Sequence, residues 1–188
     1  MKKELVLVAA GALAMLCCAC GQPSDIRSSS STEIENNVEA PEENHAVPLA
    51  IGEEAELGDW NISVTSFEFA PQIDDSTGYM YFAPDSEGSQ YGIVSVSVTN
   101  NGTEAGTFLP SYPISGDVAA TMFYNTDYEY SSTHLLGYEN ELHDAFLNPL
   151  SSISGNIVFE LPDAVVNGTE PISIAFTDGS DSVEFSLR

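Results

Sequence analysis

Apolar and polar residues alternate along most of the chain from about residue 47 onward, which is typical of strands with one buried face. Trp60, Ile62 and Val64 alternate with polar residues, and the apolar phase then shifts by one position to Phe67 and Phe69. Such a shift predicts a β-bulge, because an uninterrupted strand would send the later side chains to the opposite face.

Two further runs carry apolar side chains at every second position: Val94, Val96, Val98 and Ile157, Phe159, Leu161. Asn100-Asn101-Gly102 ends the first run with residues that favour a tight turn. Pro162-Asp163 ends the second, because proline has no backbone N–H to donate to a neighbouring strand.

Two hairpins are predicted in the second half of the chain. Residues 172–176 and 183–187 would pair across the turn Asp178-Gly179-Ser180-Asp181, and residues 118–133 would turn near Asn125-Thr126-Asp127. Few segments show the spacing of apolar residues that is typical of a helix, and we expect one short helix, over Tyr138 to Phe146.

Several short strands separated by turn residues predict an all-β fold, an Ig-like antiparallel two-sheet β-sandwich over residues 47–188. A barrel of similar strand count is the alternative. The three cysteines all lie within residues 17–20, so no disulfide is expected to hold this domain. A domain of this length buries about two-thirds of its unfolded surface, which is enough for stability without disulfides.

Three segments carry a resemblance to a known family: Ile51-Gly52-Glu53, the run from Tyr91-Gly92 to Thr99-Asn100, and Gly155-Asn156-Ile157-Val158-Phe159-Glu160-Leu161-Pro162. In this order they resemble uncharacterised Ig-like domains of bacterial lipoproteins, some of which are mislabelled as telomeric-repeat-binding factors. The resemblance covers most of residues 47–188. It implies a fold similar to that of a secreted immunogenic β-sandwich antigen, and it supplies no catalytic residues. Members usually carry Pro-Gly before the Gly-x-x-Val-Phe segment, whereas this chain has Asn148-Pro149-Leu150, so a different turn is expected there.

The N-terminus has the pattern of a bacterial lipoprotein signal. Lys2-Lys3 precede an apolar stretch from Leu5 to Cys18, and Cys20 stands between Ala19 and Gly21, before an abruptly polar sequence. We therefore expect a signal peptide over residues 1–19 and lipidation of Cys20, with a palmitate among the acyl chains. Two or three acyl chains would hold the protein at the extracellular face of the cell membrane.

Other interpretations of this leader stay open. The position three residues before a lipidated cysteine is usually leucine, and here it is Cys17. Modification of Cys17 or Cys18, a plain secretion signal and an uncleaved anchor are the alternatives.

Residues 20–46 read as a lipidated, disordered and acidic tether, because they contain too few apolar residues to offset the entropy of ordering. The net charge of the whole chain is −25, and Arg27 and Arg188 are the only fixed cations after the leader. Nucleic acid is excluded as a partner, because binding it requires Lys and Arg to displace condensed counterions. The acidic surface otherwise indicates only solubility and repulsion from anionic surfaces.

No catalytic motif stands out, and we expect neither an enzyme nor a cofactor. Beyond Lys3 there is no lysine, and Ser89 does not lie in the Gly-x-Ser-x-Gly arrangement of a nucleophile elbow. His134 and His143 are nine positions apart and lack the H-E-x-x-H spacing, and His45 falls in the tether. A Ser/His/Asp triad assembled from distant strands stays open.

Two kinds of residue are candidates for binding. Acidic residues gather in three places, Asp74-Asp75, Asp85-Ser86-Glu87 and Asp178/Asp181, where they favour turns and provide the oxygen ligands that Ca²⁺ prefers. Aromatic residues that can stack on sugars or anchor a protein partner form a second set: Tyr79, Tyr81, Phe82, Tyr124, Tyr128, Tyr130 and Tyr138.

The sequence thus predicts a membrane-tethered, extracellular lipoprotein whose Ig-like domain is a non-enzymatic binding module. Its partner would be another extracellular protein or a component of the cell envelope. Binding of Ca²⁺ or of a small sugar or cationic ligand is the alternative function. A role as an accessory stalk of a membrane complex is a further one.

Overall fold

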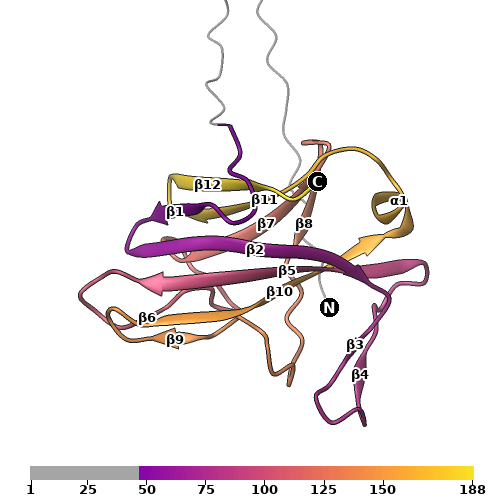
Figure 1. Cartoon of the computed structure of the whole chain (residues 1–188), viewed down its shortest axis with the longest axis horizontal. Coiled ribbons are helices and arrows are strands. Elements are labelled where there is room, and N and C mark those ends of the chain that lie inside the picture. Colours follow the sequence, from indigo (N-terminus) through magenta and orange to yellow (C-terminus); the bar gives the residue numbers. More distant parts are fainter. Residues whose placement is uncertain (1–46) are drawn as a thin grey trace, which may run out of the picture. The chain divides into compact units, whose positions relative to one another are not determined.

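The computed structural model describes residues 47–188 (Figure 1). The predicted signal peptide (residues 1–19), the lipidation site Cys20 and the predicted tether (residues 20–46) lie outside the described residues and stay predictions. Within residues 47–188, no helix has both the length and the apolar character needed to cross a membrane.

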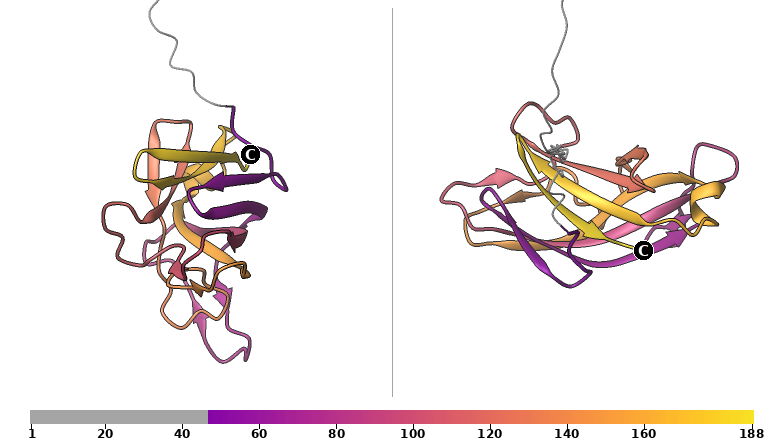
Figure 2. Two further views of the ribbon diagram at one scale, coloured as in Figure 1. Left: turned by 90° about the vertical axis from the view of Figure 1, so that its left-hand side faces the viewer. Right: turned by 90° about the horizontal axis from the view of Figure 1, so that it is seen from above.

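Two four-stranded antiparallel sheets form the body of the domain (Figures 1 and 2). The first sheet has the order β1-β2-β5-β10, with strands β1 (Glu54–Leu57), β2 (Trp60–Ala70), β5 (Ser89–Asn100) and β10 (Ser152–Pro162). The second has the order β12-β11-β7-β8, with strands β7 (Val118–Tyr124), β8 (Tyr128–Ser131), β11 (Ile172–Asp178) and β12 (Asp181–Ser186). This arrangement confirms the predicted two-sheet β-sandwich.

Smaller elements connect or extend the sheets. They comprise β3 (Ile73–Asp74) paired with β4 (Tyr81–Phe82), β6 (Gly106–Thr107) paired with β9 (Phe146–Leu147), and the helix α1 (Asp163–Val166). The β3–β4 hairpin projects from the body of the sandwich (Figure 1). Helix α1 was not expected, although the predicted end of the preceding strand at Pro162 is confirmed.

One hydrophobic core lies between the two sheets, and side chains of both contribute to it. Phe108 is fully buried there, and its ring lies 5.4 Å from that of Trp60 on β2 and 5.8 Å from that of Phe176 on β11. Phe159 on β10 and Phe185 on β12 are also fully buried. Each such side chain contributes about 1.5–3 kcal/mol relative to an exposed one, so the core holds the sandwich without disulfides.

The irregularities that the sequence predicted are present. The register between β2 and β5 shifts between Val64 and Ser66, which confirms the β-bulge. The β7–β8 hairpin turns at Asn125 and Thr126, whose φ angles of 52° and 57° are those of a tight hairpin turn. The terminal hairpin pairs β11 with β12 in the expected place.

The helix predicted over Tyr138 to Phe146 is wrong, because the chain there is extended or turned. Tyr138 N–H donates to Leu135 C=O and Glu141 N–H donates to Tyr138 C=O, which makes two successive turns. Gly137, with φ of 89°, supplies a conformation that a helix does not contain. Residues 132–145 are called the edge segment below, because they run along the free edge of β10.

Backbone pairing with β10 explains why the edge segment is not helical. Thr133 N–H donates to Val158 C=O, Leu142 N–H donates to Asn156 C=O, and Asn156 N–H donates to Asn140 C=O. These bonds satisfy part of an edge strand that would otherwise leave its polar groups unpaired. The tertiary gain exceeds a weak local preference for helix.

A turn different from that of the family was expected at Asn148-Pro149-Leu150, and the structure shows a β-turn there. Ser151 N–H donates to Asn148 C=O, and Leu150 adopts φ of 60° at the second central position. Such a position favours glycine, which the family's Pro-Gly pair supplies. The chain therefore forms this turn with a leucine in a strained backbone conformation.

Candidate functional site

The acidic residues highlighted by the sequence mostly organise turns. Asp75 accepts hydrogen bonds from the Thr77 hydroxyl and from the backbone N–H groups of Tyr79 and Met80. These bonds lower the pKa of the Asp75 carboxyl, and the bond from the Thr77 hydroxyl contributes most. Among residues 47–188, Asp74, Asp85 and Asp178 join no group of three potential metal ligands.

The candidate aromatic residues do not form one surface: Tyr128 is exposed on β8, and Phe82 and Tyr138 pack against the smaller cluster of buried residues. Tyr79 is 92% exposed and Tyr81 is 66% exposed, and both belong to the projecting β3–β4 hairpin. Tyr124 and Tyr130 are half-buried and pack against the main core. The aromatic candidates therefore divide between an exposed hairpin and the cover of the core.

The structure brings together two histidines that are nine positions apart in the sequence, His134 and His143. The rings of His134 and His143 lie with their centroids 5.7 Å apart and at 86° to each other. The edge segment positions both of them. Leu135, next to His134, is buried in the smaller core beside β10, and Leu142, next to His143, is fully buried in the main core.

A carboxylate lies between the two histidines. Glu141 Oε1 is 2.9 Å from His143 Nδ1 and 3.2 Å from His134 Nδ1. The side chains of Glu141 and His143 are only 7% and 4% exposed, whereas that of His134 is 39% exposed. Leu135 N–H also donates to the Glu141 carboxylate, at 2.9 Å from Oε1 and 3.1 Å from Oε2. Three nitrogen atoms therefore lie around a single oxygen atom.

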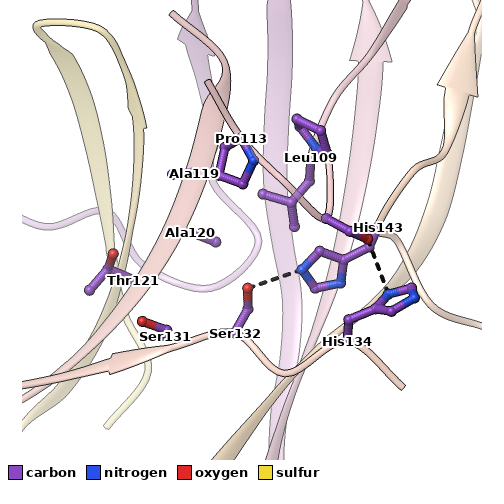
Figure 3. Close-up of a pocket in the computed structure, with 11 residues that line it drawn as sticks. Leu109, Pro113, Ala119, Ala120, Thr121, Ser131, Ser132, His134 and His143 are labelled. Atoms are coloured by element: carbon purple, nitrogen blue, oxygen red, sulfur yellow. Dashed lines mark hydrogen bonds between the residues drawn. The ribbon is translucent and has the colours of Figure 1, made fainter. Parts of the chain in front are cut away.

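Two serines and a second carboxylate surround this cluster. Ser132 Oγ lies 3.0 Å from His143 Nε2, a contact drawn in Figure 3, and Ser111 Oγ lies 3.2 Å from His134 Nδ1. Ser111 also donates its hydroxyl proton and its backbone N–H to Asp144. These two bonds are the main reason why the pKa of the Asp144 carboxyl is lowered.

A hollow of about 250 Å³ opens beside the cluster (Figure 3). Its lining combines residues of β7, the end of β8, the loop that contains Leu109 and the edge segment: Leu109, Pro110, Ser111, Pro113, Ala119, Ala120, Thr121, Ser131, Ser132, His134 and His143. Apolar walls with a few hydroxyl and imidazole groups are the usual lining of a small-ligand site.

The cluster has the chemistry of two kinds of site. His134, Glu141 and His143 each offer one potential ligand atom, and these atoms lie within 4.8 Å of one another. In addition, Ser132 contacts His143 and His143 contacts Glu141. This is the arrangement of a nucleophile, a base and an orienting carboxylate.

The sequence did contain a signal for this cluster. Glu141-Leu142-His143 places two ligand-type residues at spacing two, and in an extended chain such residues point to the same side. In the helix that was expected, they would point to nearly opposite sides. The incorrect helix prediction therefore concealed the pair.

The fold and the site together define a two-sheet β-sandwich protein with a polar, histidine-lined hollow at one edge. The family model described as "Domain of unknown function (DUF4352)" matches residues 49–180, and the chain belongs to that family. A comparison with curated proteins gives no match.

Solved structures of similar fold come from several bacteria. An uncharacterized β-sandwich protein from Clostridium difficile has a TM-score of 0.56 at 16% identity, covering 79% of this chain and 100% of that one. A conserved hypothetical protein from Bacillus anthracis has a TM-score of 0.55 at 13% identity, covering 74% and 95%. A secreted protein from Mycobacterium tuberculosis has a TM-score of 0.43 at 13% identity, covering 75% and 98%, too low to support an argument. The first two likenesses support the β-sandwich fold.

Proposed function

We propose that this protein is a lipoprotein anchored at the extracellular face of the cell membrane through acyl chains on Cys20. Its β-sandwich acts there as a non-enzymatic binding domain for a small polar ligand of the cell envelope. The observation that carries the binding role is the hollow beside His134 and His143, where hydroxyl and imidazole groups converge on one space. Its volume of about 250 Å³ fits a small molecule better than a protein segment.

The lipid anchor is tested by labelling cells with a fatty-acid analogue. The wild-type chain and a Cys17→Ala variant should carry the label and sediment with membranes. A Cys20→Ala variant should carry none. Equal labelling of the Cys20→Ala variant would contradict acylation at that residue.

The binding role is tested by adding the small-molecule fraction of native envelopes to the isotope-labelled chain and recording NMR spectra. Resonances of the residues that line the hollow should shift in the wild type. A Ser131→Trp variant, which fills the hollow from β8, should lose the response. The matched variant Glu129→Trp, on the same strand but outside the lining, should keep it. Unchanged spectra for the wild type would count against a small-ligand function.

One observation favours a second function, hydrolysis by a serine nucleophile. Ser132 Oγ, His143 Nε2 and Nδ1, and Glu141 Oε1 form a continuous chain of contacts at 3.0 Å and 2.9 Å. Those distances are within the range for general-base activation of a hydroxyl. An organophosphonate probe that labels the wild type but not a Ser132→Ala variant would favour this function over pure binding.

A further inference from the structure

We propose that His134, Glu141 and His143 form a binding site for a divalent transition-metal ion, and that the ion is Zn²⁺. This inference rests on the proposed binding function, because the metal would lie at the rim of the same hollow. The ion differs from Ca²⁺, the alternative ligand considered for the acidic turns, because this site offers nitrogen as well as oxygen ligands.

The spacing of the three potential ligand atoms supports a metal site. Zinc bonds to histidine nitrogen and carboxylate oxygen are about 2.0–2.2 Å long, so tetrahedral ligands lie about 3.3 Å apart. Glu141 Oε1 is 2.9 Å from His143 Nδ1 and 3.2 Å from His134 Nδ1. All three ligand atoms lie within 4.8 Å of one another, and binding of one ion would require the side chains to rotate.

The groups that contact the three candidate ligands are also typical of a metal site. A histidine that ligates a metal through one nitrogen usually donates the N–H of the other to a fixed acceptor. If His143 Nδ1 binds the ion, then Nε2 carries the proton and donates it to Ser132 Oγ, 3.0 Å away. The Leu135 N–H, 3.1 Å from Glu141 Oε2, would orient the carboxylate in the same way.

The local charge favours a dication. The Glu141 carboxylate contacts both histidines, and the Asp144 carboxylate accepts hydrogen bonds from Ser111, whose hydroxyl oxygen lies 3.2 Å from His134 Nδ1. Arg188, the only Lys or Arg in residues 47–188, is engaged with the Val165 and Glu170 carbonyls. A divalent ion would therefore bring positive charge beside two carboxylates.

The donor set selects the class of metal. Two imidazoles and one carboxylate suit Zn²⁺ and its neighbours in the first transition row, whereas Ca²⁺ and Mg²⁺ require oxygen ligands. Three protein ligands leave a fourth position for water or an exchangeable ligand. His134 and His143 both line the hollow, so that position would be reached from it.

The test is calorimetric titration of the full chain with zinc, after dialysis against a chelator. The wild type should bind, and a His134→Ala/His143→Ala double variant, which keeps the leader cysteines, should lose this binding. A His45→Ala variant should bind as the wild type does. Ca²⁺ in place of zinc should give no heat.

Three further readouts keep the test independent of folding defects. Ser132→Ala retains all three ligands and should weaken zinc binding about 10–100-fold. Nitrogen NMR should show the Nδ1–H tautomer of His143 without metal and the Nε2–H tautomer with it. Zinc at one hundred times its dissociation constant should raise the Tm by about 5–10 °C.

The outcomes separate this inference from the proposed function. Equal zinc binding by the wild type and the double variant, or no binding at millimolar zinc, would overturn the metal site. If envelope ligands still bind the hollow in chelator, then only the metal inference fails. If zinc binds while no envelope ligand does, then the small-ligand function fails and the metal site stands.

Discussion

Glu141 and His143 lie two residues apart in the edge segment, and their side chains meet with Oε1 2.9 Å from Nδ1. The contact is nearly sealed from water, since only 7% and 4% of the two side chains are exposed. A carboxylate in such a place must be hydrogen-bonded, and Leu135 N–H supplies a further donor. Glu141 therefore connects the two ends of the edge segment, through Leu135 N–H and His134 on one side and His143 on the other.

Truncation of Glu141 should be costly. A Glu141→Ala variant leaves the Leu135 N–H and a nearly buried imidazole without their acceptor, so we expect a loss of about 1–3 kcal/mol in the free energy of unfolding. Glu141→Gln keeps a carbonyl acceptor and should lose less. Urea unfolding in the presence of chelator measures both. The control is Glu139→Ala, at an exposed neighbouring position, which should change little, and equal losses for residues 139 and 141 would contradict this account.

Gly155 should be intolerant of a side chain. A Cβ atom at this position on β10 would lie 2.9 Å from the Asn140 carbonyl oxygen, in the backbone of the edge segment. Gly155→Ala should therefore push that segment away from β10 and destabilise the protein by about 1–3 kcal/mol. Ser154→Ala, at the exposed neighbouring position, is the control and should be near neutral in the same urea experiment. A neutral Gly155→Ala would show that the edge segment is not packed as described.

Replacement of Leu150 by glycine should stabilise the protein. Leu150 is 81% exposed and has φ of 60°, a conformation that costs a side chain about 1–2 kcal/mol. Part of the gain is offset by the greater entropy of glycine in the unfolded chain, which leaves about 0.5–1 kcal/mol. Leu136→Gly is the matched control, because Leu136 is 85% exposed and has no positive φ. It should destabilise, and the same sign for both variants in urea unfolding would refute the strain argument.

Glu160 should make stability depend on pH in the acid range. Hydrogen bonds from the Ser86 hydroxyl first, and then from the Ser86 and Asp85 backbone N–H groups, lower the pKa of the Glu160 carboxyl from its usual 4.5. Because the folded pKa is below the unfolded one, this stabilisation is present above about pH 4.5. It is lost as the pH falls through the folded value.

The Glu160 effect is checked by urea unfolding at neutral pH and at successively lower pH. Glu160→Gln should be less stable than the wild type at neutral pH and should lose less stability on acidification below about pH 4.5. Glu56→Gln, at an exposed position of β1, is the control and should follow the wild type. Parallel pH curves for Glu160→Gln and the wild type would contradict the assignment.

The sequence predicts the sandwich well because its signals are local. Each signal involves only neighbouring residues of one strand. The signals are the alternation at Ile62 and Val64, the phase shift before Phe67 and the proline at position 162. Their structural consequences follow from the period of a strand and from the missing proline N–H. The longest strands and the two hairpins β7–β8 and β11–β12 could therefore be located from the sequence.

The candidate site escaped prediction because it depends on a distant strand. The edge segment follows the unpaired edge of β10, to which it bonds through Asn156 and Val158. Nothing near His134 in the sequence indicates that pairing, and the local residues alone suggested a helix. The position of Ser111 beside His134 likewise depends on a loop that precedes β7, which no pattern around either residue indicates.

The central claim, that the histidine-lined edge of the sandwich is a binding site for a metal ion, is tested most directly by anomalous diffraction. Crystals of the protein grown with zinc would be measured above and below the zinc absorption edge. The account predicts a single strong anomalous peak about 2.0–2.2 Å from His134 Nδ1, His143 Nδ1 and Glu141 Oε1. Crystals that contain zinc elsewhere, with these three side chains still bonded only to one another, would contradict it.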